Sequence, residues 1–139
     1  MATSMVVYEG MNYMLNSSLK GVAATSTWYA GVITNSGYTP ALSHTLAGNL
    51  ASMGEVANFG GTRALLSATV ATGVYDATAS PVQFTNSSTT VTAYGVFVCS
   101  QSAVGNSTGT LLGVYLFTSA RTLANGEILQ VPVTLTDSN

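Results

Sequence analysis

Two segments of the chain, residues 91–99 and 111–117, are apolar at nearly every position. Successive side chains of a strand point to opposite faces of its sheet, so a strand that is apolar on both faces must be covered on both sides. The two segments are therefore predicted to be central strands with a layer of structure over each face. This requirement restricts the chain to folds of packed layers.

Further short strands are expected around these two. Alternating apolar positions in residues 127–136 indicate a strand with one buried face. Pro132 cannot donate to a ladder, so either this strand lies at an edge or the N–H side of Pro132 points outward. The turn Asn125-Gly126 between residues 121–123 and 127–129 predicts a β-hairpin, since both turn residues accept positive φ. The other expected strands are residues 27–34, 63–70 and 82–85.

Two short helices are expected in the N-terminal half. Apolar residues recur at helical spacing in residues 5–19, and Gly21 would end that helix. Thr39-Pro40 predicts the start of a second helix that runs to Met53. We therefore expect a single domain over residues 1–139, mainly β, with an immunoglobulin-like or jelly-roll-like β-sandwich and one or two short helices.

Charge is scarce in this chain. Charged residues make up 6% of it, against about a quarter of an ordinary soluble domain, and residues 81–120 carry none. Proteins use interspersed charges for solubility and to protect strand edges, so this deficit favours an assembly subunit that lies against partners. Three cationic side chains give nucleic-acid binding little electrostatic basis, and no nucleic-acid partner is expected.

No group of residues predicts catalysis or metal binding. His44 is the only histidine, and we expect it on a helix surface, where Ser43 and Thr45 would diverge from it. Cys99, the only cysteine, is expected to be a buried packing residue without a basic neighbour. With five scattered carboxylates there is no ligand pair, so we expect no enzyme, no catalytic residue, no metal and no cofactor. A small hydrolase that uses His44 is the least favoured alternative.

No segment predicts secretion or membrane insertion. The first residues carry no cation before Lys20 and no apolar run followed by a cleavage site, and no apolar stretch is long enough to span a bilayer. The chain is therefore expected to be made in a cytoplasm and to have no membrane partner.

Several stretches, taken in order, resemble one known family. They are Leu15-Asn16-Ser17-Ser18-Leu19-Lys20-Gly21, the strand with Trp28-Tyr29, the turn Asn35-Ser36-Gly37, Gly61-Thr62-Arg63, and the segments 81–86, 93–97, 109–112 and 121–127. This order resembles that of small virion proteins of tailed bacteriophages, of the capsid decoration (cement) or head fibre type.

The resemblance implies a non-enzymatic protein on the capsid surface of a virion, made in the host cytoplasm. Its expected partner is the major capsid protein, and a homo-oligomer, trimer or dimer, is expected on the particle. By bridging capsid subunits it would stabilise the shell, and linking subunits already held in place makes modest contacts effective. The alternative is a head or tail fibre module that binds host-surface glycan, which the Thr-, Ser-, Asn- and Gly-rich loops suggest.

Five residues are candidates for an interface. Met5 and Met11 belong to a Met-rich segment whose flexible side chains suit docking, although packing against the chain's own sandwich is the alternative. Trp28 and Tyr29 point to opposite faces of their expected strand, which leaves one of them, by preference Tyr29, for a neighbour. Tyr38 follows the turn and is a candidate for glycan contact.

Overall fold

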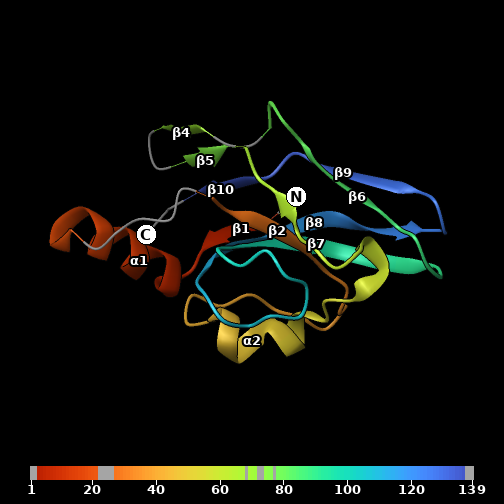
Figure 1. Ribbon diagram of the computed structural model, residues 1–139, viewed down its shortest axis with the longest axis horizontal. Coiled ribbons are helices and arrows are strands. Elements are labelled where there is room, and N and C mark those ends of the chain that lie inside the picture. The colour runs from red at the N-terminus through yellow and green to blue at the C-terminus, as the bar shows by residue number, and fades with distance from the viewer. Residues whose placement is uncertain (1–2, 22–26, 68, 72–73, 77, 137–139) are drawn as a thin grey trace.

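The computed structural model describes residues 3–21, 27–67, 69–71, 74–76 and 78–136 (Figure 1). Its central element is a five-stranded antiparallel sheet with the strand order β1-β8-β7-β2-β3. The strands, in that order, are Thr3–Val6, Leu111–Leu123, Val91–Cys99, Tyr29–Ile33 and Ala64–Leu65. β7 and β8 therefore lie inside the sheet, as their doubly apolar sequence predicts.

A second layer of strands covers one face of this sheet. β6 (Val82–Thr85) pairs with β9 (Ile128–Val131), and β10 (Thr134–Thr136) joins β5 (Val74–Asp76) and β4 (Thr69–Ala71). Buried apolar residues of the central sheet, β6, β9 and β10 form one cluster, which includes Phe84, Val96, Val98 and Val131. In Figure 1 this second layer lies on the opposite side of the central sheet from α2 (Leu46–Met53).

The helix α2 and its flanking loops cover the other face. Leu46, Leu50 and Met53 of the helix are buried in a second cluster with Ile33 and Phe97 of the sheet. A 3-10 turn, η1 (Ala57–Phe59), follows the helix. Both faces of β7 are thus covered, as are those of β8 over residues 111–114, whereas residues 118–122 of β8 are exposed. The fold is mainly β and sandwich-like, with short helices in the N-terminal half, as expected.

The first helix begins later than the sequence predicts. Residues 3–6 form β1, which pairs with β8 from Thr3 opposite Leu116 to Val6 opposite Gly113. This ladder pairs the backbone groups of the segment that face β8, so α1 (Tyr8–Lys20) starts only after it. Its predicted end is confirmed, because Gly21 closes the helix with a φ of 70°.

The predicted start of the second helix is wrong. Residues 39–45 form an irregular segment, and Thr45 is the N-cap, whose Oγ1 accepts a hydrogen bond from the amide of Gly48 at 3.0 Å. A carboxylate from another element also helps the helix to start there, because Glu9 of α1 accepts from the amide of Leu46 at 3.1 Å. This tertiary contact is not visible in the local sequence.

The predicted hairpin is also wrong, although its turn is present. Gly126 has a φ of 91°, but β9 pairs with β6 while β8 stays in the central sheet with β7. Buried Asn86 fixes this crossing: its carbonyl accepts from Gly126 at 2.6 Å and its side-chain amide donates to the carbonyl of Leu123 at 2.9 Å. The chain changes layer here because the apolar side chains of β9 complete the core from the opposite side.

Candidate functional site

The most extensive polar cluster surrounds Arg63 and lies in the interior. The Arg63 guanidinium pairs with Glu55 through Nη2–Oε1 and Nε–Oε2 distances of 2.6 and 2.8 Å, with side-chain exposures of 0% and 4%. Its other N–H groups donate to Cys99 Sγ and to the carbonyls of Gln101 and Asn106. All five N–H donors of the guanidinium have acceptors within the protein. The cluster therefore links three loops, and its guanidinium has no donor left for a ligand.

Cys99 is buried, as predicted, but it has a basic neighbour that the sequence does not reveal. Its Sγ lies 3.2 Å from Nη1 of Arg63. Burial nevertheless raises the pKa of the Cys99 thiol, and the nearby cation offsets this only in part. Burial alone would lower the pKa of Arg63, but the hydrogen-bonded Glu55 holds it above its ordinary value. The cluster thus contains a neutral thiol and a fixed ion pair, which is a structural arrangement.

His44 does not lie on a helix surface, because α2 starts only after it. Its Nδ1 is 3.0 Å from the hydroxyl of Tyr38, and the two rings are tilted with centroids 5.5 Å apart. Tyr38 is buried, with 8% of its surface exposed, and burial raises its pKa to about 12. This partly buried hydrogen bond joins the two ends of the loop before α2.

The predicted interface residues lie mostly within the protein's own packing. Met5 and Met11 are half-buried and pack against the two core clusters, one on each side of the sheet. Trp28 is half-buried in edge-to-face contact with Tyr13 of α1, with ring centroids 5.3 Å apart. Tyr29 is half-buried at the start of β2. The structure does not bring these residues and Tyr38 together into one patch.

A different group of apolar residues is exposed on α1. Tyr8, Leu15 and Leu19 are 51%, 54% and 78% exposed, and helical spacing places them on one face with exposed Asn12. We call these four residues the α1 surface. The opposite face of the helix lies against β8, where Gly10 is buried over the backbone of Leu112. The apolar spacing of residues 5–19 contains this signal, but an amphipathic pattern is normally assigned to the buried face of a helix.

A shallow cavity of about 480 Å³ borders the α1 surface. Tyr8 and Asn12 line it on the helix side, and Ser43, Thr45 and Thr110 line it on the opposite side. The α1 surface is therefore a ridge beside a shallow cavity, and a partner of complementary shape can pack against both.

Within the described ranges, no three histidine, cysteine, aspartate or glutamate side chains gather as metal ligands. No helix among the same residues is long and apolar enough to cross a membrane. In comparisons with known proteins, neither a protein-family model nor a curated protein matches the chain.

Proposed function

We propose that this chain is a capsid decoration (cement) protein of a tailed bacteriophage, which binds the outer surface of the head and bridges subunits of the major capsid protein. The observation that carries the proposal is the α1 surface, on which Tyr8, Leu15 and Leu19 are more than half exposed. A helix with apolar residues on its solvent side is suited to contact with another surface, because burying a leucine contributes about 1.5–3 kcal/mol.

The low charge of the chain supports the same role. Charged residues make up only 6% of the sequence, and two of them, Arg63 and Glu55, are paired inside the fold. A surface with few charges loses little solvation when it is covered by a partner. The order of the sequence segments resembles that of phage virion proteins, which supports the major capsid protein as the partner.

The binding of purified chain to isolated heads tests the proposal. The double variant Leu15→Ser/Leu19→Ser should bind heads at least tenfold more weakly than the natural chain, since two exposed apolar contacts are lost. Bound chain is quantified by mass spectrometry of sedimented heads, and high copy number per head is expected for the natural chain.

The matched control is Ile128→Ser, which makes a similar change on β9, away from α1, at a residue that is 55% exposed. This variant should bind heads as the natural chain does, and circular dichroism should show that all variants are folded. Equal binding of the α1 double variant, or absence of the chain from heads, would reject the proposal.

A further inference from the structure

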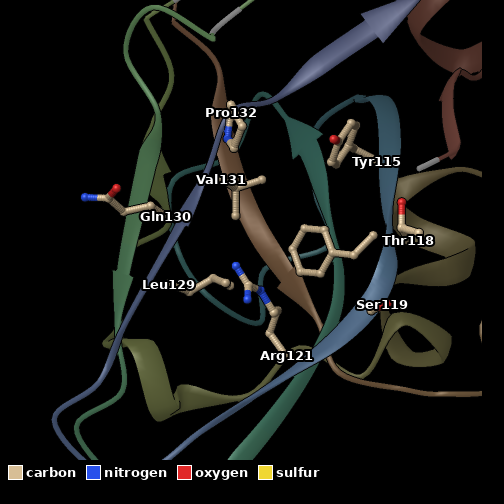
Figure 2. A pocket seen from close by; sticks show the side chains of 9 residues that line it. Tyr115, Thr118, Ser119, Arg121, Leu129, Gln130, Val131 and Pro132 are labelled. Atoms are coloured by element: carbon tan, nitrogen blue, oxygen red, sulfur yellow. The ribbon is translucent and has the colours of Figure 1, made fainter. Parts of the chain in front are cut away.

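An open groove runs between β8 and the segment formed by β9 and Pro132 (Figure 2). It has a volume of about 300 Å³, and an adjoining hollow of about 390 Å³ shares Arg121, Leu129 and Gln130 with it. The size matches the smaller sites for small molecules, which begin at about 300 Å³.

The groove is a consequence of how β8 is paired. Ala93 of β7 lies opposite Arg121, whereas Gly95 lies opposite Leu116, so residues 117–120 of β8 form an irregular bulge. Among the described residues, β1 pairs with β8 only as far as Leu116, and β9 pairs only with β6. The two layers therefore diverge here, and the space between their edges is open.

Arg121 is the cation of this groove. It is exposed, and in the described part of the chain its guanidinium has no hydrogen bond or ion pair. Figure 2 shows its side chain directed toward Leu129, across the groove. Glu127 borders the adjoining hollow, but its carboxylate accepts the amide of Ala124 at 2.6 Å instead. The fork of the guanidinium is thus free to take a carboxylate in a bidentate hydrogen bond.

The other walls offer apolar rings and hydroxyl groups. Tyr115 and Phe117 are half-buried in an edge-to-face arrangement, with ring centroids 6.2 Å apart, and both line the groove. Thr118 and Ser119 also line the groove and add exposed hydroxyl groups at its rim. A ligand that satisfies all of these groups has an apolar ring face, several hydroxyls and one negative charge. A sugar with a carboxylate combines these properties, since the C–H face of a pyranose packs on aromatic side chains.

We propose that this groove binds a carboxylate-bearing sugar, a hexuronic or sialic acid at the end of a glycan. Arg121 holds the carboxylate of the sugar. Tyr115 and Phe117 pack against the sugar ring. Thr118 and Ser119 form hydrogen bonds with the hydroxyl groups of the sugar. A single free cation favours a singly charged carboxylate over a phosphate, which proteins usually hold with several donors. The site goes beyond head binding and is independent of it, since it uses no residue of the α1 surface.

Titration of the full-length chain with sugars, followed by amide chemical shifts in nuclear magnetic resonance, tests the site. Glucuronate and N-acetylneuraminate should shift the amides of residues 117–121 and 129–131. Glucose tests for recognition of the neutral ring alone, and acetate for recognition of the anion alone; both should bind at least tenfold more weakly. Equal binding of acetate and glucuronate, or no shift with either acidic sugar, would overturn the proposal.

Two charge-removing variants separate this site from general electrostatic attraction. Arg121→Gln should weaken glucuronate binding at least tenfold, because the charged fork is lost. Lys20→Gln removes one cation at the exposed end of α1 and should bind glucuronate as the natural chain does. If both variants lose affinity equally, or neither does, the carboxylate is not held by Arg121 and the assignment is wrong.

Discussion

Arg63 and Glu55 show how strongly one side-chain pair can organise a protein with few charges. The guanidinium has carboxylate, thiol and carbonyl acceptors, and it lies 5.0 Å from the ring centroid of Phe97. The amide of Gly105 donates to the same carboxylate at 2.9 Å. Segments far apart in the sequence are therefore held together by this ion pair and its hydrogen bonds, on the face of the sheet where Phe97 lies.

Removal of either partner should be costly for stability. Glu55→Ala leaves the Arg63 charge buried and unpaired, and we expect the free energy of unfolding to fall by about 3–5 kcal/mol. Urea denaturation measures this loss. The exposed change Arg121→Gln serves as the control and should shift stability by less than about 0.5 kcal/mol. A similar small effect of Glu55→Ala would show that the buried pair is not a stabilising contact.

Tyr38 gives the protein a pH dependence on the alkaline side. Its pKa is raised from 10.0 to about 12 in the folded chain, so the neutral phenol stabilises the fold fully below pH 10. This contribution, roughly 2–3 kcal/mol, is lost as the pH rises from 10 toward 12. In urea denaturation across this range, Tyr38→Phe should lose less stability than the natural chain. Parallel pH profiles for the two proteins would contradict this assignment.

The sequence predicted the burial of some residues better than it predicted their contacts. Burial of Cys99 follows from its apolar neighbours, and the structure confirms it. The contact of Cys99 with Arg63 joins residues 36 positions apart, and no local pattern encodes it. The exposure of Leu15 and Leu19 was likewise not predictable, because helical spacing alone does not say which face of a helix meets the sheet.

Among the elements, α1 depends on a close approach to the sheet. A Cβ atom on Gly10 would lie 2.5 Å from the carbonyl oxygen of Leu112. Gly10→Ala should therefore destabilise the protein by about 1–3 kcal/mol, although alanine favours helices by about 1 kcal/mol over glycine. Thermal unfolding followed by circular dichroism measures the effect.

Ser18→Ala provides the control within the same helix. This residue is exposed, so only helix propensity should act, and a small gain in stability of about 0.5 kcal/mol or less is expected. If Gly10→Ala were as stable as Ser18→Ala, α1 would have room to move away from β8, and its docking would be looser than the structure shows.

Elements with strong local patterns were predicted well, and those decided by long-range pairing were not. The bounds expected for β6 and β7 are those of the structure. The hairpin failed because Asn125-Gly126 specifies a turn but not the partner of the strand that follows it. Pro132 was informative, since it lies at the interruption between β9 and β10.

For the whole molecule, the layered arrangement predicts an order of local stability. β7 has a strand on each side and cover on both faces, whereas β9 belongs to a two-stranded sheet at the margin. Amide hydrogen exchange should therefore be slowest in β7 and the paired half of β8, and at least tenfold faster in β9. Equal protection of β7 and β9 would mean that the two layers open only together.

The placement of charge in the interior has a final consequence for the response to ionic strength. Arg63 and Glu55 neutralise each other inside, and the carboxylate of Glu9 accepts two backbone amides, so contacts through the α1 surface involve little Coulomb attraction for salt to screen. The proposed attachment to heads should therefore persist, or tighten, as salt is raised. A sugar acid held by Arg121 should instead be released under the same conditions. Salt concentration alone would then distinguish the two surfaces of one small protein.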